Sequence, residues 1–299
     1  RYIEGAMLTY LRKLDLVAPS KRHDASYDDS AGRFSGAYVK DPNPGRYEWV
    51  YDLDLTSMYP STIMTLNISP ETKIGKLKGY SAEQHMKGNL ETYSIIDDGG
   101  NEFPPLPKEK FLKFIEKNKY SVAANGVLYR TDKVGVIPEI LSVWFDKRVE
   151  YKNLMKKYGK EGNDEQYKFY GKRQLVQKIM LNSLYGVLGL PSFRFYDVDN
   201  AEATTITGQT VIKTTELIAN QYYSKVIGQE ADYNVYTDTD SVFYQAMQVG
   251  MLETKNISWK LLDSYYTLSE SITLDEIKAA GKAYITTKKP LITVLKPKE

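Results

Sequence analysis

Apolar and polar positions recur along the chain with two different periods, which separate predicted helices from predicted strands. Apolar residues spaced three or four apart predict helices over residues 1–18, 59–66, 138–158, 165–188 and 200–227. Runs of β-branched and aromatic residues bounded by turn formers predict strands over residues 49–55, 233–236 and 242–244. The pattern therefore predicts an α+β fold built on an antiparallel sheet.

Two of the predicted helices are long, and a short polar turn joins them. Pro138 lies in the first turn of the helix over residues 138–158, where its missing N–H is tolerated. Residues 159–164 reverse the chain, so that the helix over residues 165–188 runs back beside the first one. The sequence thus indicates a two-helix antiparallel insertion between strand-rich parts.

The predicted hairpin near residue 240 carries two carboxylates at its tip. Residues 236–241 read Tyr-Thr-Asp-Thr-Asp-Ser, so Asp238 and Asp240 are separated by one residue. Asp is common in turns because its side chain bonds its own backbone, and for this stretch alone that interpretation is as good as a cation site. The argument for a cation site is electrostatic. Two crowded carboxylates repel each other, which costs free energy unless a cation lies between them.

A third carboxylate, Asp54, lies at the end of the strand predicted over residues 49–55. A Thr-Ser pair and a Tyr-Pro step follow it, which suits a strand that runs into a turn and then a helix. One carboxylate there and two on a neighbouring hairpin would form the ligand set of a two-cation site. Oxygen ligands favour Mg²⁺ or Mn²⁺, and two such ions about 3.5–4 Å apart suit in-line phosphoryl transfer.

The helix predicted over residues 165–188 places Lys178, Asn182 and Tyr185 on one face, at spacings of four and three. A cation, an amide and an aromatic ring in a row match the triphosphate, sugar and base of a nucleotide. A solvated helix face carries the same residue types, so this pattern alone is a weak signal.

Together, the three stretches resemble the family B DNA polymerases. Residues 54–61 (Asp-Leu-Thr-Ser-Met-Tyr-Pro-Ser) are similar to motif A of that family, residues 178–186 to motif B and residues 236–241 to motif C. The resemblance runs from about residue 36 to residue 240, and Asn-Ile-Ser-Pro-Glu-Thr at residues 67–72 is similar to the replicative polymerases of large tailed phages. It implies template-directed DNA synthesis with two Mg²⁺ ions, for which Mn²⁺ can substitute.

The resemblance also implies a role for each matching residue. Asp54 and Asp240 would bind both metal ions, with Asp238 a weaker contributor and the backbone of Leu55 a further ligand. Tyr59 would lie under the deoxyribose and collide with a ribose 2′-hydroxyl. The residues expected to bind the nucleotide are Leu55, Thr56, Ser57, Met58, Tyr59, Arg148, Lys152, Lys178, Asn182, Tyr185 and Gly186. The residues expected to bind DNA are Gly36, Ala37, Tyr38, Lys288 and Lys289, although Pro290 and Leu291 depart from the family pattern that follows the two lysines.

The same resemblance divides the chain into parts. Residues 1–137 would form the N-terminal part of the palm with motif A, residues 138–189 the fingers helices, and residues 190–299 the C-terminal part of the palm with motif C. No Asp-x-Glu opens a proofreading site and few residues follow Lys289, so exonuclease and thumb domains are expected to be absent from this chain. The expected partners are primer–template DNA, deoxynucleoside triphosphates, and either a separate chain with the missing domains or a sliding clamp.

Two other functions remain as alternatives. The first is a non-catalytic nucleic-acid-binding or scaffold remnant of a split polymerase, against which the retained Asp54, Asp238 and Asp240 argue. The second is a reverse transcriptase or RNA polymerase, which Thr239 between the aspartates and the bulky Tyr59 disfavour.

Composition narrows the picture further. The chain has 299 residues, of which 42% are hydrophobic and 26% charged, and it lacks cysteine, which excludes disulfides and thiolate metal sites. The sequence contains no 18-residue apolar run, so we expect no membrane partner and a cytoplasmic location, in the host cytoplasm if a phage encodes it. Net charge is only +2, but residues 101–180 hold 17 Lys and Arg against 10 Asp and Glu, an excess of 7. That excess fits either a phosphate-rich partner or a solvated, lysine-rich helix face.

Overall fold

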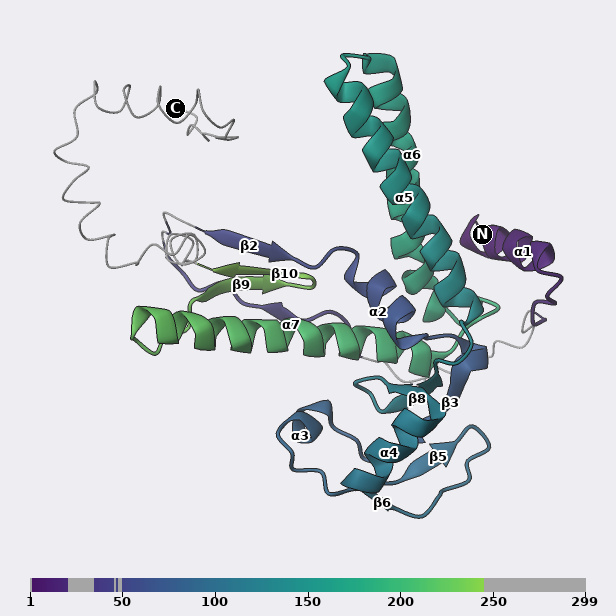
Figure 1. Cartoon of the computed structure of the whole chain (residues 1–299), viewed down its shortest axis with the longest axis vertical. Helices are drawn as coiled ribbons and strands as arrows, with labels where there is room; N and C mark the ends of the chain where they lie inside the picture. Colours follow the sequence, from purple (N-terminus) through teal and green to yellow (C-terminus); the bar gives the residue numbers. More distant parts are fainter. Residues whose placement is uncertain (1, 21–34, 46, 48–49, 245–299) are drawn as a thin grey trace. The chain divides into compact units, whose positions relative to one another are not determined.

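The computed structural model describes residues 2–20, 35–45, 47 and 50–244, which belong to one compact unit, Arg1–Gln245. Lys288 and Lys289, and the palm elements expected after residue 244, lie outside the described residues. Helices and antiparallel sheets alternate in this unit (Figure 1), so the predicted α+β architecture is confirmed. None of the described helices combines the length and apolar character needed to cross a lipid bilayer.

The first sheet contains the predicted carboxylate hairpin and the strand predicted before it. Its strands follow the order β1-β9-β10-β2, and all neighbours are antiparallel. The hairpin forms because strand-forming residues flank a two-residue polar turn. The strands are β1 (Val39–Lys40), β2 (Tyr51–Asp54), β9 (Asn234–Asp238) and β10 (Ser241–Tyr244).

Two long helices form the predicted antiparallel hairpin, and Figure 1 shows them side by side. They are α5 (Val136–Lys160) and α6 (Asp164–Leu188), so each begins or ends within two residues of its predicted limits. The Asn163 side chain caps α6 by accepting a hydrogen bond from the Gln166 N–H. The Tyr158 and Tyr170 rings stack between the helices with centroids 5.5 Å apart, which ties their far ends together.

A third long helix, α7 (Val198–Ile227), begins at the capping residue Asp197, whose side chain accepts from the Asn200 N–H. It ends at Gly228, which adopts φ 76° as helix C-caps require. Small buried residues such as Ala201, Thr204 and Gly208 line the side of α7 that packs on other elements. Their size lets α7 approach α2 (Met58–Leu66) closely.

A smaller part of the unit lies between α2 and α5 in sequence. It has a second antiparallel sheet of order β5-β3-β8-β7, a two-stranded sheet β4-β6 and its own apolar core around Tyr93 and Phe111, whose rings stack with centroids 4.2 Å apart. A tight turn at residues 97–101 closes on the Asp97 backbone, with Gly100 at φ 82°. The elements are η1 (Pro70–Thr72), β3 (Lys73–Leu77), α3 (Ala82–Met86), β4 (Thr92–Tyr93), β5 (Ile95–Asp97), β6 (Leu106–Pro107), α4 (Lys108–Asn118), β7 (Tyr120–Val122) and β8 (Val127–Arg130).

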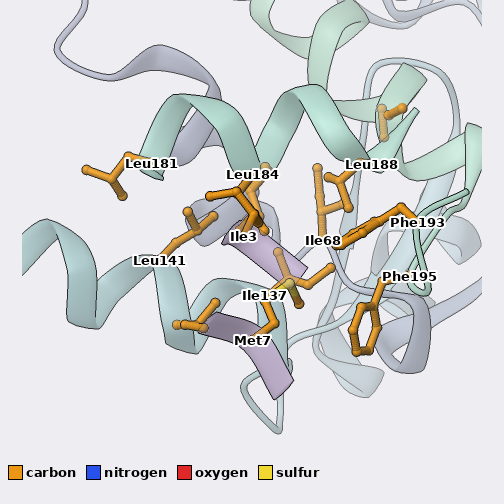
Figure 2. Packing of buried hydrophobic residues seen from close by; sticks show 14 of the residues in the cluster. Ile3, Met7, Ile68, Ile137, Leu141, Leu181, Leu184, Leu188, Phe193 and Phe195 are labelled. Atoms are coloured by element: carbon orange, nitrogen blue, oxygen red, sulfur yellow. The ribbon is translucent and has the colours of Figure 1, made fainter. Parts of the chain in front are cut away.

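The main core joins the base of the α5–α6 hairpin to the N-terminal helix α1 (Tyr2–Lys13). Figure 2 shows Met7 of α1 among the buried side chains of this cluster, which include Leu141 of α5 and Leu181 of α6. Helix α1 is shorter than the predicted span of residues 1–18, because Asp15 adopts φ 52°, a left-handed conformation that a helix does not continue through.

Leu181→Ala should destabilise the unit far more than Leu175→Ala, although both leucines lie on α6. Leu181 is fully buried, so its truncation should lower the free energy of unfolding by about 2–5 kcal/mol. Leu175 is 49% exposed, and its truncation should change that free energy by about 0.5 kcal/mol or less. Urea denaturation of both variants measures the difference. Equal losses would show that the core in Figure 2 is misplaced.

Candidate active site

The register of the first sheet brings Asp54 and Asp238 onto one face. Ser241 of β10 lies directly opposite Asp238 on one side and directly opposite Asp54 on the other. Directly opposite residues of antiparallel strands point their side chains to the same face of the sheet. The strand pairing therefore places the strand that ends at Asp54 next to the carboxylate hairpin.

The turn between β9 and β10 holds Asp240 beside the end of β2. Thr239 adopts φ 56°, and its N–H donates to the Tyr38 carbonyl at 3.0 Å. The Asp240 carbonyl accepts from the Leu55 N–H at 2.8 Å, which fixes Asp240 next to the residue that follows Asp54. The Thr239 hydroxyl donates to the Asp238 carboxylate at 2.9 Å. The turn therefore separates the three carboxylates into a neighbouring pair, Asp54 and Asp240, and a locally bonded Asp238.

A cavity of about 500 Å³ lies at this edge of the sheet, between the start of α2 and the facing sides of α5 and α6. Carboxylates from the sheet and cations from the two helices line it together. Its lining residues are Asp54, Thr56, Ser57, Met58, Tyr59, Pro60, Arg148, Lys152, Lys178, Asn182, Tyr185, Thr239 and Asp240.

Most of the predicted site residues therefore meet in one place, with three exceptions among the catalytic and nucleotide-binding set. Asp238, Leu55 and Gly186 do not line the cavity. Two residues that the sequence did not suggest, Pro60 and Thr239, do line it. Their positions inside the motifs could have indicated both residues, because Pro60 follows Tyr59 and Thr239 lies between Asp238 and Asp240.

Helix α2 begins in a way that leaves its first N–H groups without a side-chain cap. Ser57 occupies the N-cap position with φ 52°, and its side chain makes no capping hydrogen bond. The Ser57 hydroxyl instead accepts from the Arg148 guanidinium at 2.8 Å, which joins α5 to the start of α2. The uncapped N–H groups and the positive end of the helix dipole favour an anion at this end of the cavity.

The carboxylate pair carries an electrostatic cost. Burial raises the pKa of Asp240, and the neighbouring charges of Asp54 and Asp238 raise this pKa further, while Lys178 opposes them. Within the described residues, no three His, Cys, Asp or Glu side chains gather closely enough to hold a metal ion by themselves. A divalent cation fits this site through Asp54 and Asp240 together with backbone, substrate or water oxygens, because such ions accept mixed oxygen ligands.

Two tyrosine rings, Tyr59 of α2 and Tyr185 of α6, line the same cavity as the basic side chains of α5. Tyr59 and Tyr185 stack with their centroids 4.3 Å apart and an interplanar angle of 30°. Burial, followed by the charges of Tyr185, Asp240 and Asp238, raises the pKa of Tyr59 to about 12. Tyr59 is therefore a neutral ring at physiological pH, suited to contact with a sugar or base rather than to proton transfer.

Helix α7 holds the segment that includes Gly36 and Tyr38, which the sequence assigned to DNA. Three α7 side chains at helical spacing, Gln209, Lys213 and Glu216, form what we call the α7 seam. The Gln209 amide donates to the Gly36 carbonyl at 2.6 Å, and the Lys213 ammonium lies 4.6 Å from the Tyr38 ring centroid. The seam therefore fixes a segment whose Tyr38 carbonyl bonds the carboxylate turn.

The ion pairs of Lys40 add further support to the segment that includes Gly36 and Tyr38. Lys40 bonds Glu216 at 2.9 Å and Asp232 at 2.6 Å. Burial alone lowers the pKa of Lys40, but hydrogen bonds to the two carboxylates raise it overall. Lys40 therefore stays charged and links β1, α7 and the residues before β9. That DNA contacts Gly36, Ala37 or Tyr38 stays a prediction.

Comparisons with known proteins give a consistent result. A family model described as DNA polymerase family B matches residues 1–296. The chain is 29% identical over 265 residues to a DNA-directed DNA polymerase of Escherichia phage RB69, an alignment that covers 72% of this chain and 27% of that protein. It is also 29% identical over 282 residues to a DNA polymerase of Archaeoglobus fulgidus, covering 94% of this chain and 28% of that protein.

A solved structure agrees with these matches. The family B DNA polymerase of Pyrobaculum calidifontis has a TM-score of 0.51 with this chain at 27% sequence identity, over 81% of this chain and 25% of that one. The motif-based resemblance is confirmed, including its phage relatives. The chain spans about a quarter of the length of the curated relatives that it matches.

Asp54→Asn should raise the melting temperature at pH 7 in the presence of a chelator. A raised carboxyl pKa means that folding disfavours the ionised form, so stability falls as pH rises from the ordinary Asp range through the raised pKa of Asp240. Removing the Asp54 charge lessens this loss above that range, and the gain should vanish at low pH, where protonated Asp240 carries no charge to be repelled.

Thermal melting at pH 7 and at low pH measures this effect. The matched control is Asp52→Asn, because Asp52 is an exposed residue of the same strand. An unchanged or lower melting temperature for Asp54→Asn at pH 7 would contradict the repulsion described for the pair.

Proposed function

The chain belongs to DNA polymerase family B, and on that premise we propose that it catalyses template-directed DNA synthesis, adding deoxynucleotides to a primer 3′-hydroxyl. The observation that carries the proposal is the single cavity that joins Asp54 and Asp240 to the cations of α5 and α6. The comparisons cover about a quarter of each relative, so the activity of the whole protein is inferred from this site.

The carboxylates would bind two Mg²⁺ ions, with Mn²⁺ as a substitute. Asp54 and Asp240 are the proposed ligands, and Asp238 has a weaker role because its carboxylate already accepts from Thr239. When bound, the ions would lower the pKa of the primer 3′-hydroxyl and neutralise the leaving pyrophosphate. The backbone of Leu55 is a further proposed ligand. The non-catalytic alternative is not favoured, because a scaffold gains nothing from the Asp54–Asp240 repulsion.

The basic side of the cavity would bind the triphosphate. Arg148 suits a terminal phosphate because its fork donates two parallel hydrogen bonds, whereas Lys152 and Lys178 act as point charges. A phosphate that binds Arg148 would take over the hydrogen bond now made to Ser57. The N–H groups at the start of α2, around residues 55–58, would receive the remaining phosphate oxygens.

The aromatic side would bind the sugar and the nascent base pair. Tyr59 presents a ring where a ribose 2′-hydroxyl would collide, which would select deoxyribonucleotides. Asn182, Tyr185 and Gly186 would lie along the base pair, with Gly186 allowing close approach because it has no side chain.

Primer–template DNA would contact the segment with Gly36, Ala37 and Tyr38. A sliding clamp, or a separate chain with exonuclease or thumb domains, is a further possible partner under this proposal.

Asp240→Asn and Asp54→Asn should each lower Mg²⁺-dependent primer extension by about a hundredfold or more, because each removes charge that stabilises the transition state. Asp238→Ala should lower the rate of primer extension less than either of these two variants. A primer-extension assay with four deoxynucleotides measures all three, and Asp52→Asn serves as the control on the same strand. Extension at the wild-type rate by either of the first two variants would refute the metal-site assignment.

Arg148→Ala and Lys152→Ala should raise the KM for deoxynucleotide by roughly tenfold to a hundredfold, the worth of one hydrogen bond to a charged group. Lys147→Ala is the control, because Lys147 lies on the same helix but pairs with Glu150 at the surface. Affinity for primer–template without nucleotide should stay within about twofold of the wild type, since these side chains face the triphosphate. An equal loss of DNA binding would assign them to the duplex.

A further inference from the structure

Gly208 of α7 lies directly behind the start of α2. A β-carbon at this position would stand 2.9 Å from the Met58 Cε atom and 3.1 Å from the Tyr59 Cε1 atom. Both distances are shorter than normal carbon–carbon contacts. Because Gly208 has ordinary helical φ, glycine is needed here for space and not for backbone conformation.

The position is costly for the helix. Glycine inside a helix is less favourable than alanine, because it loses more backbone freedom on folding. Gly208 is buried and lies well inside the 30-residue helix α7, so it acts neither as a cap nor as a turn residue. The close packing of α2 on α7, which glycine allows, is what offsets this cost to the helix.

The Tyr59 ring is confined on two sides. Its edge meets α7 at Gly208, and one face stacks on Tyr185 at 4.3 Å. Tyr59 also lines the cavity, together with Asp240. A group added at residue 208 would push the Tyr59 ring away from α7, on the side of the ring that Tyr185 leaves free.

We propose that Gly208 is a positioning residue for sugar selection, because it sets how far the Tyr59 ring extends into the nucleotide cavity. The inference rests on the proposed function. It adds a residue outside the cavity lining that controls the space left for the 2′ position of the sugar. Met58 does not carry this effect, because its flexible thioether can turn aside whereas the Tyr59 ring is held by Tyr185.

The test compares primer extension with matched deoxyribo- and ribonucleotides by the complete chain and its variants. Gly208→Ala should raise the ratio of deoxyribonucleotide to ribonucleotide efficiency by about fivefold, the effect of a side chain displaced by about 1 kcal/mol. The KM for the deoxynucleotide should rise as well. In the Tyr59→Ala background, where the ratio should fall on its own, Gly208→Ala should change it no further.

Gly5→Ala is the matched control. Gly5 lies on α1, where an added β-carbon meets nothing within 4 Å, so this substitution has the same helix propensity effect without the contact. The ratio of deoxyribonucleotide to ribonucleotide efficiency in Gly5→Ala should equal that of the wild type. If Gly208→Ala does not fold, Gly208→Ala with Met58→Val removes the flexible sulfur and methyl group and keeps the Tyr59 contact. It is compared with Met58→Val alone.

The possible outcomes are distinct. Extension with an unchanged ratio in Gly208→Ala, or the same shift in the Tyr59→Ala background, would overturn the inference and leave the proposed function standing. Loss of folding in both residue-208 variants would assign Gly208 to core packing and also overturn it. Failure of the wild-type chain to incorporate any deoxynucleotide would overturn the proposed function, and this inference with it.

Discussion

The site depends on a turn of two residues that forces two like charges together. The Asp240 carbonyl accepts from the Leu55 N–H, and the Thr239 N–H donates to the Tyr38 carbonyl, so the turn is bonded to the residue after β2 and to the residue before β1. Strand β10 pairs with β2 along all four of its residues, and with β9 through a register shift between Phe243 and Tyr244. The sheet can therefore keep Asp54 beside Asp240 at a cost that isolated side chains would avoid. Such a cost is common where stability is exchanged for function.

Helix α7 supports that arrangement from two directions. The α7 seam holds the Tyr38 segment, which bonds the turn, while Gly208 lets α2 approach so that Tyr59 reaches the cavity. The half-buried Lys40–Glu216 pair belongs to the same support, and an ion pair in this position contributes more by fixing geometry than by net stability. One rigid helix thus sets the positions of both the carboxylate turn and the aromatic ring. A change on α7 can alter the site without touching a substrate.

Local sequence signals predicted much of this fold because they reflect local physics. Apolar spacing predicted α5, α6 and α7 to within two residues, and the β-branched runs around Thr239 predicted the hairpin. The family resemblance, and not a local pattern, grouped Asp54, Arg148 and Lys178, and all three line one cavity. The division into palm and fingers parts and the DNA-binding residues stay predictions.

What the sequence could not supply lies in contacts between distant residues. Lys40 and Glu216 are 176 residues apart, and neither has a local pattern that names its partner. Helix α1 ended early because of one left-handed residue, which apolar spacing does not report. The role of Gly208 was the hardest to predict, because a glycine in a helical pattern indicates only a less stable helix. Its meaning appears once the β-carbon it lacks is placed against Tyr59, and the distance of 3.1 Å makes it a constraint on the site.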